Sequence, residues 1–245
     1  MEFRLLKGNI VDAKTDAIVL PANTKLKEGS GASEAIFHAA GKRDLTKACK
    51  EIGFCEEGSA VPTLAFAMDA KYIVHAVVPR WIDGNHREYE LLCSAYASAL
   101  ELADVMFCES IAFPLLASGN NGFDAELAFE IAVNSFKAYK SQNLKDVVLV
   151  VYNNQTAQMA QNAGYNVGVL PVDLSKEEEM YKKKLERRQK QDEFKKAAGM
   201  VIHDQLIKGI EYFRDEEHRN HVIDLADKIL AAAMIVKNKK RNRGH

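Results

Sequence analysis

Residues 110–123 read S-I-A-F-P-L-L-A-S-G-N-N-G-F and join a short apolar run to a loop of small and polar residues. The run at 110–114 is typical of a buried strand, and a helical pattern follows at 124–140. Glycine and asparagine between a strand and a helix usually form a tight turn. Backbone N–H groups exposed in such a turn can also bind an anion, so 115–123 is a candidate ligand loop.

Alternating strand and helix patterns extend on both sides of this stretch. Helical patterns lie at 33–41, with Ser33 as the expected N-cap and Gly41 as the expected C-cap, and at 86–104. The other apolar runs that are typical of strands lie at 3–6, 16–20, 59–61, 71–78 and 146–152. Strands separated by helices predict an α/β fold, a three-layer α/β/α sandwich with a mixed, largely parallel sheet.

The sequence becomes highly charged after residue 171. We therefore expect one α/β domain at 1–171 and a charged helical C-terminal extension at 172–245. Within the extension, apolar residues recur at helical spacing between 200 and 236 and form faces that need a partner. This pattern predicts a protein partner or self-association through 200–236.

Composition argues against several classes of protein. The chain has 245 residues, 47% hydrophobic content and a formal net charge of −1. No apolar run approaches the roughly 20 residues of a membrane helix, and no signal-peptide pattern is present, so we expect a cytoplasmic protein. The four cysteines form no C-x-x-C pair, which indicates reduced thiols and no metal site. We do not expect nucleic acid as a partner, because the charge is nearly balanced.

Three polar loops follow strand patterns and are expected to meet at one edge of the sheet. They are residues 20–33, 115–123 and 152–154. Because ligands of parallel α/β sheets bind beyond the carboxyl ends of the strands, the loops together favour a nucleotide pocket. The sequence has neither a P-loop nor a complete dinucleotide-binding glycine motif, and we expect no cofactor.

Five blocks of sequence within residues 6–171 resemble the macro domain family, whose members bind ADP-ribose. The blocks are L-K-G-N-I-V-D-A-K-T-D-A-I-V-L-P-A-N at 6–23, G-S-G-A-S-E-A-I-F-H-A-A-G at 29–41, Y-I-V-H-A-V-V-P-R-W at 72–81, Y-E-L-L-C-S-A-Y-A-S-A-L-E-L-A at 89–103, and the stretch 110–123. They occur in the order of the family motifs and cover about two-thirds of the chain.

The resemblance implies which residues contact ADP-ribose. Asn9 and Ile10 are expected at the adenine, and Asn23 at the distal ribose. Tyr152 would stack on the adenine, and Phe123 would close the pocket. The loops beside the ribose and the diphosphate add Gly29, Ser30, Gly31, Ser33, Ala117, Ser118, Gly119, Asn120, Asn121 and Gly122.

Four positions depart from the family pattern. Asn9 replaces the aspartate that accepts the adenine amino group, Leu20 replaces an asparagine, and Ala117 replaces a serine. Ser33 stands where the hydrolytic branch of the family carries an aspartate that activates water, and serine has no comparable basicity. Other members without that aspartate still cleave, by positioning water with the asparagine and the phosphate of the substrate.

The resemblance leaves two functions open. The first is an ADP-ribose-binding macro domain protein that hydrolyses ADP-ribosyl-protein or O-acetyl-ADP-ribose esters, with Asn23 as the candidate catalytic residue. The second is a non-catalytic ADP-ribose reader or scaffold whose C-terminal helices bind a protein partner. In both, the binding partner is ADP-ribose or an ADP-ribosylated protein.

The remaining conspicuous side chains are assigned structural roles. His75 lies within an apolar run, so we expect a core histidine rather than a catalytic one. Trp81 and Tyr96 are interpreted as core anchors. Glu88 and Glu90 are interpreted as part of a solvated helix face.

Overall fold

The computed structural model describes residues 1–171 of the chain, and the predicted extension at 172–245, with its partner surface at 200–236, lies outside the described residues. The elements of the described part follow one another in this order: β1 (Glu2–Lys7), η1 (Ile10–Asp12), β2 (Ala17–Ala22), α1 (Ala32–Ala40), α2 (Lys42–Ile52), β3 (Ala60–Leu64), β4 (Tyr72–Val77), α3 (Glu88–Val105), β5 (Ser110–Pro114), α4 (Ala125–Ala138), β6 (Asp146–Val151), α5 (Asn154–Asn162) and β7 (Val167–Val169).

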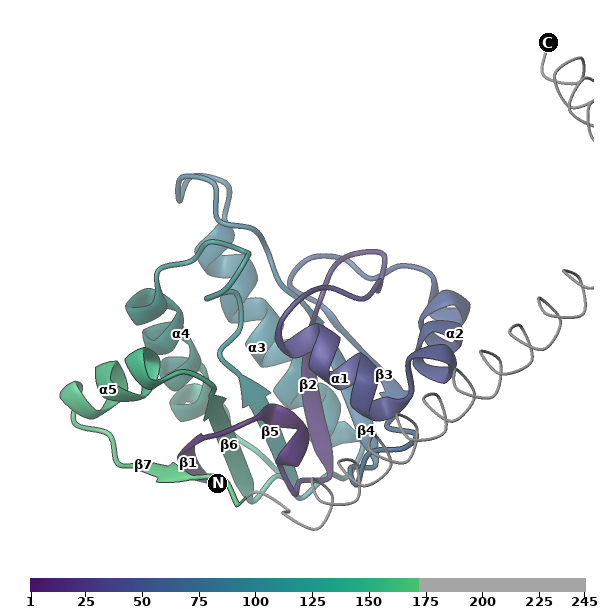
Figure 1. Cartoon of the computed structure of the whole chain (residues 1–245). Helices are drawn as coiled ribbons and strands as arrows, with labels where there is room; N and C mark the ends of the chain where they lie inside the picture. The colour runs from purple at the N-terminus through teal and green to yellow at the C-terminus, as the bar shows by residue number, and fades with distance from the viewer. Residues whose placement is uncertain (172–245) are drawn as a thin grey trace, which may run out of the picture. The chain divides into compact units, whose positions relative to one another are not determined.

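The seven strands of residues 1–171 form one sheet in the order β3-β4-β2-β5-β6-β1-β7 (Figure 1). Only the β3–β4 pair is antiparallel, and every other neighbouring pair is parallel. The expected mixed, largely parallel sheet is therefore confirmed. The parallel strands all end at the same edge of the sheet, which is where polar loops can converge.

Apolar side chains on both faces of the strands create two separate hydrophobic clusters. Successive residues of a strand point to opposite faces, so alternate residues of β2 and β5 enter different clusters. Helices α3, α4 and α5 pack on one face, while α1 and α2 pack on the other (Figure 1). This arrangement is the three-layer α/β/α sandwich that the alternating pattern predicted.

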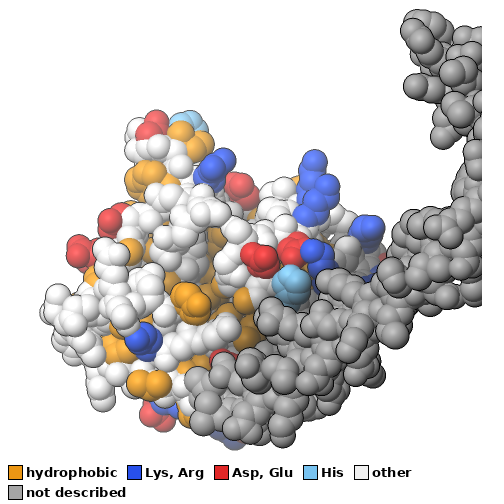
Figure 2. All heavy atoms as spheres, viewed as in Figure 1, with side chains coloured by type: hydrophobic (Ala, Val, Ile, Leu, Met, Phe, Trp, Pro, Cys, Tyr) orange, Lys and Arg blue, Asp and Glu red, His pale blue; other side chains and the backbone are white. Residues whose placement is uncertain are grey.

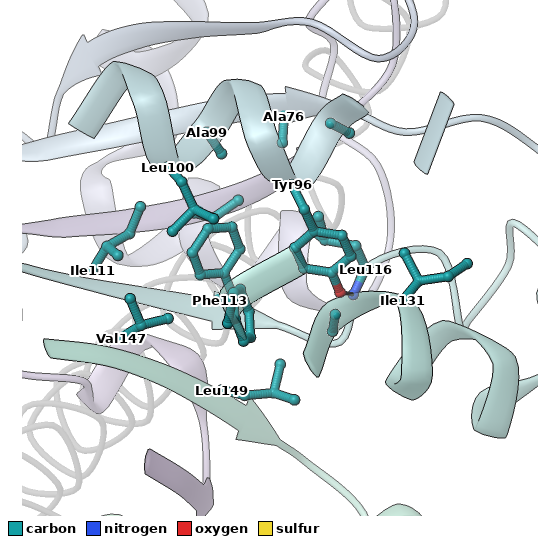
Figure 3. Packing of buried hydrophobic residues seen from close by; sticks show 14 of the residues in the cluster. Ala76, Tyr96, Ala99, Leu100, Ile111, Phe113, Leu116, Ile131, Val147 and Leu149 are labelled. Carbon is teal, nitrogen blue, oxygen red and sulfur yellow. Dashed lines mark hydrogen bonds between the residues drawn. The ribbon is translucent and has the colours of Figure 1, made fainter. Parts of the chain in front are cut away.

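Among residues 1–171, Tyr96 of α3 is the largest fully buried side chain, and it packs against Phe113 of β5 with ring centroids 5.5 Å apart (Figure 3). Its hydroxyl accepts a hydrogen bond from the Leu116 N–H at 3.0 Å. Tyr96 thereby ties the helical layer to the loop that begins after β5. The expected role as a core anchor is confirmed for this residue.

His75 lies in the middle of β4 with no exposed surface, as expected of a core histidine. Its Nε2 atom is 2.9 Å from Oγ1 of Thr63 on the neighbouring strand β3. Burial lowers the pKa of His75 to about 4, so the imidazole is neutral at physiological pH.

Some local expectations are wrong. Ser33 does not cap α1, because the helix begins at Ala32 with Gly31 at the N-cap, and Ser33 is a buried residue of the first turn. Gly41 does end the helix, as expected, with a φ of +95° that favours glycine. The sequence patterns also did not predict α2, α5 and β7.

Glu88 is not on a solvated face. Its carboxylate is buried and accepts hydrogen bonds from the N–H groups of Ile82, Asp83, Gly84 and His86, at 3.1, 3.2, 3.1 and 2.6 Å. Burial alone would raise the pKa of Glu88, but these N–H groups outweigh it and lower the pKa to about 2. Glu88 therefore organises the loop before α3, whereas Glu90 is exposed as expected.

Within residues 1–171, none of the helices combines the length and the apolar content that a membrane span requires. The four cysteines are free thiols, and Cys49, Cys55 and Cys108 are buried. Burial raises the pKa of Cys49 to about 11, so this thiol is a poor nucleophile.

Candidate functional site

A cavity of about 880 Å³ lies beyond the carboxyl ends of the parallel strands. The three polar loops that were predicted to meet at this edge all contribute to its wall. Figure 2 shows this face hollowed near its centre, with hydrophobic side chains in the hollow and most charged side chains away from it. A cavity of this size, with apolar walls and a few polar groups, is typical of a small-molecule site.

The sheet order fixes how the predicted residues follow one another along the cavity. The strand ends run in the order β4, β2, β5, β6 and β1. Asn23 follows β2, the loop 115–122 follows β5, Tyr152 follows β6, and Asn9 follows β1. An elongated ligand lying across the strand ends would therefore meet these residues in that order.

Nearly all of the predicted site residues line the cavity. The lining includes Asn9, Ile10, Asn23, Gly29, Ser30, Gly31, Ser33, Ala117, Ser118, Gly119, Asn120, Asn121 and Tyr152. Gly122 and Phe123 do not belong to the wall. Phe123 is buried and packs against Trp81 with ring centroids 5.0 Å apart, so it supports the loop from behind.

The loop after β5 presents a row of free backbone donors. The N–H groups of Ser118, Gly119, Asn120 and Asn121 donate to no acceptor within residues 1–171. The loop is closed from behind by a bond from the Gly122 N–H to the Gly119 carbonyl at 3.0 Å. Consecutive N–H groups that face a cavity form a site suited to a phosphate or another anion.

Ala117 has a φ of +63°, a conformation that favours glycine over residues with a β-carbon. From the family resemblance, Ala117 was notable only for lacking the hydroxyl of a serine. The structure shows that backbone conformation and burial restrict the residue type at this position, because the Ala117 side chain is buried and its backbone turns the loop. A small residue is therefore required here.

The glycine loop before α1 also lines the cavity. Gly31 and Ala32 line the cavity at the N-terminus of α1, where unpaired N–H groups and the helix dipole favour negative charge. Ser33 supports the loop through its Oγ, which accepts from the Gly29 N–H at 3.1 Å. The amide nitrogen of Asn120 donates to Oγ of Ser30 at 2.6 Å and so links the glycine loop to the loop after β5.

Asn23 orders its own loop as well as lining the cavity. Its Oδ1 accepts from the N–H groups of Lys25 and Lys27 at 3.2 and 3.1 Å, and its Nδ2 donates to the Lys27 carbonyl at 2.7 Å. One N–H of the Asn23 amide remains for a ligand or a water. The side chain is exposed, so a ligand can reach it.

The far end of the cavity holds Asn9 and Tyr152. Asn9 Oδ1 accepts from the Val11 N–H at 3.4 Å and starts the short helix η1. Tyr152 is 79% exposed directly after β6, and its ring is free to contact a ligand. Nearby, Asn153, the N-cap of α5, and Thr156 within α5 also line the cavity.

Sequence reasoning missed two charged residues of the wall, Glu57 and Arg80. Arg80 follows β4 just as the predicted loops follow their strands, so the carboxyl-end rule could have identified it. Glu57 comes before β3 and reaches this edge because β3 is antiparallel to β4, which the sequence pattern did not reveal.

One group of described residues has the composition of a metal site. Ligand atoms of Asp83, His86 and Glu88 all lie within 4.8 Å of one another. However, both oxygens of Glu88 already accept backbone hydrogen bonds that hold the surrounding loop. We therefore assign this group a structural role.

Comparison with known proteins identifies the family of this fold. The Macro domain profile matches residues 19–132. A macro domain-containing protein from Caldanaerobacter subterraneus subsp. tengcongensis is 40% identical over 167 residues, which are 66% of this chain and 95% of the relative. The chain belongs to the macro domain family.

Other similar macro domains carry the name of an activity or were solved with a bound ligand. An O-acetyl-ADP-ribose deacetylase from Salmonella gallinarum is 38% identical over 64% of this chain and 90% of its own length. A mutant macrodomain from Oceanobacillus iheyensis, solved with ADPR, shares 30% identity and a TM-score of 0.61 over 64% of this chain and 89% of its own. A Trypanosoma brucei macrodomain in complex with ADP-ribose shares 25% identity and a TM-score of 0.59, over 66% and 68% of the two chains.

Proposed function

We propose that this macro domain binds ADP-ribose in the cavity and releases it from ester-linked derivatives. The observation that carries the proposal is the row of free N–H groups at Ser118 to Asn121, residues that share the cavity wall with the N-terminus of α1. A diphosphate between these two groups of donors would have its charge compensated without any cationic side chain. The proposal places the adenine beside Tyr152 and the distal ribose beside Asn23.

The ester-cleaving step would rest on a positioned water. The cavity wall of the described residues carries no His, Cys or Asp, and Ser33 is buried and bonded to Gly29. The remaining N–H of Asn23 would hold the distal ribose and a water, and the loop N–H groups would stabilise the developing negative charge. With an acetyl ester, water adds to the acyl carbon and the bond between that carbon and the ribose oxygen breaks. The ribose oxygen takes up a proton from the water, and acetate and ADP-ribose leave. Relatives named O-acetyl-ADP-ribose deacetylase support this reaction class.

Calorimetry and a turnover assay test the two parts separately. We expect micromolar binding of ADP-ribose to the full chain, and steady release of acetate from O-acetyl-ADP-ribose. Asn23→Asp keeps the acceptor for the Lys25 and Lys27 N–H groups but loses both amide N–H groups, the free one and the one that donates to the Lys27 carbonyl. Turnover is expected to fall about a hundredfold, and more than the affinity for ADP-ribose. Asn23→Ala would add the loss of loop order.

The outcomes separate a hydrolase from a reader. An absence of binding heat at millimolar ADP-ribose would overturn the proposal altogether. Binding without release of acetate, and without release of ADP-ribose from a protein modified on acidic side chains, would leave the non-catalytic reader as the function.

A further inference from the structure

The cavity extends one strand beyond the residues that the family resemblance singled out. Its wall passes Asn23 at the end of β2 and continues to Val78 and Arg80 at the end of β4, with Glu57 beside them. Glu57 and Arg80 are the only charged residues in this wall, as far as the described residues show. Both charges therefore gather at one end of an otherwise uncharged site.

Arg80 has no partner of its own within the described residues. It forms no hydrogen bond or ion pair there. By contrast, seven lysine and arginine side chains of this part of the chain are paired, and five of them meet an acidic neighbour. Its guanidinium, with five donors, is exposed and available to an anion that enters the cavity.

The backbone that carries Arg80 is held firmly against the phosphate-facing loop. Asn121 Nδ2 donates to the Pro79 carbonyl at 3.0 Å, and the Trp81 N–H donates to the Asn121 carbonyl at 2.7 Å. On the other side, the Val78 N–H donates to the Ala22 carbonyl at 3.2 Å, next to Asn23. Arg80 therefore lies at a fixed place between the predicted ribose residue and the loop after β5.

On the basis of the proposed function, the order of the strand ends indicates which part of a bound ligand lies near Arg80. With the adenine at β6 and β1, the diphosphate at β5 and the distal ribose at β2, only one neighbouring strand end remains, that of β4. A group attached to the distal ribose, such as a modified peptide, must leave the cavity on this side. Arg80 is then the first charged group that the peptide meets.

We propose that Arg80 forms a subsite for the acceptor peptide and selects ADP-ribosylated segments with carboxylates next to the modified residue. Guanidinium and carboxylate form paired hydrogen bonds of matched geometry, which makes arginine well suited to this recognition. Asn121 is the positioning residue of the subsite. Glu57 lies at the same end and has the opposite charge. It repels such carboxylates and so limits the preference for acidic peptides.

Binding of peptides that carry ADP-ribose through a non-hydrolysable linkage tests the subsite with the full-length chain. Three peptides are compared with free ADP-ribose: one with glutamates, one with serines and one with lysines around the modified position. The wild type is expected to bind the acidic peptide roughly fivefold more tightly than the neutral one, and this difference should shrink at high salt. Arg80→Ala should abolish the difference between the acidic and the neutral peptide, with each affinity taken relative to that for free ADP-ribose.

Three further variants test the charge preference of the subsite. Arg80→Lys keeps the charge without the planar fork and should restore part of the preference. Glu57→Gln removes the opposing charge and should increase the preference for the acidic peptide. Arg43→Ala removes one positive charge from the exposed face of α2, away from the cavity wall, and should change nothing.

Several results would overturn the subsite. If the wild type binds ADP-ribose but does not discriminate among the peptides, the subsite is wrong while the proposed function stands. The same holds if Arg80→Ala weakens free ADP-ribose and all peptides equally, because Arg80 would then contact the nucleotide. If the wild type binds no ADP-ribose, both the proposed function and the subsite fall.

Discussion

Tyr152 is an aromatic side chain that the fold leaves in solvent at the mouth of the cavity. At 79% exposure it is the most exposed large hydrophobic residue of residues 1–171. It follows directly on Val151, which is buried at the end of β6. An exposed ring contributes little to the stability of the fold, so we expect the role of Tyr152 to be contact with a ligand.

Tyr152→Ala is expected to weaken ADP-ribose binding about tenfold, because stacking of a base on an aromatic ring is lost. The free energy of unfolding should stay unchanged, and Tyr152→Phe should bind nearly as well as the wild type. Calorimetry and urea unfolding measure the two quantities. Tyr89→Ala, which removes an exposed tyrosine outside the cavity wall, is the control. Unchanged affinity in Tyr152→Ala would place the adenine elsewhere.

At the scale of elements, Asp104 near the end of α3 holds in place the loop that joins α4 to β6. Its buried carboxylate accepts from the N–H groups of Gln142, Asn143 and Leu144 at 2.8, 2.6 and 2.9 Å. The hydroxyls of Tyr139 and Ser141 add two bonds of 3.1 Å each. One side chain thereby positions the segment that leads into β6, the strand that Tyr152 directly follows.

The pKa of Asp104 predicts acid sensitivity of this connection. Burial would raise the pKa, but the N–H donors outweigh it and lower it from 3.8 to about 2. Because the folded-state pKa is below the unfolded one, the stabilisation is present above about pH 4 and is lost as the pH falls toward 2. The free energy of unfolding should therefore decrease across this window.

Asp104→Asn is expected to reduce the free energy of unfolding at neutral pH by about 2 kcal/mol, because charge-assisted hydrogen bonds become neutral or are lost. Its stability should also depend less on pH between 4 and 2 than that of the wild type. Urea unfolding at both ends of the window measures this, with Asp44→Asn on the exposed face of α2 as the control. An equal acid response in both variants would assign the effect to other carboxylates.

The elements that sequence reasoning missed share a weak hydrophobic pattern. Helix α2 buries only Leu45 and Cys49, and β7 is three residues long and contains a glycine. Both are held by neighbours that come from elsewhere in the chain, as β7 is paired with β1. By contrast, β2, β4, β5 and β6 are almost entirely buried and were predicted from their apolar runs.

At the scale of the molecule, residues 1–171 contain a complete sheet with both hydrophobic clusters. The Caldanaerobacter relative matches this part over 95% of its own length. Both observations support the proposal that the α/β domain predicted at 1–171 is an independent folding unit. The extension predicted at 172–245 would then be dispensable for binding ADP-ribose.

A chain truncated after residue 171 is expected to unfold in one cooperative transition and to bind ADP-ribose within about threefold of the full chain, since all the described lining residues are retained. Thermal unfolding and calorimetry on both chains measure this. Aggregation of the truncated chain, or a much larger loss of affinity, would show that residues 172–245 are needed by the domain.

The sequence by itself determined the class of fold, the family and most of the cavity wall. It could do so because apolar runs and the glycine- and asparagine-rich loops that follow them are local signals. Tertiary structure alone decided that Glu88 is buried, that Ala117 requires a left-handed turn, and that Phe123 packs behind the loop. It also brought Glu57 to the site through an antiparallel strand. These outcomes depend on which segments become neighbours, and the local pattern of residues does not contain that information.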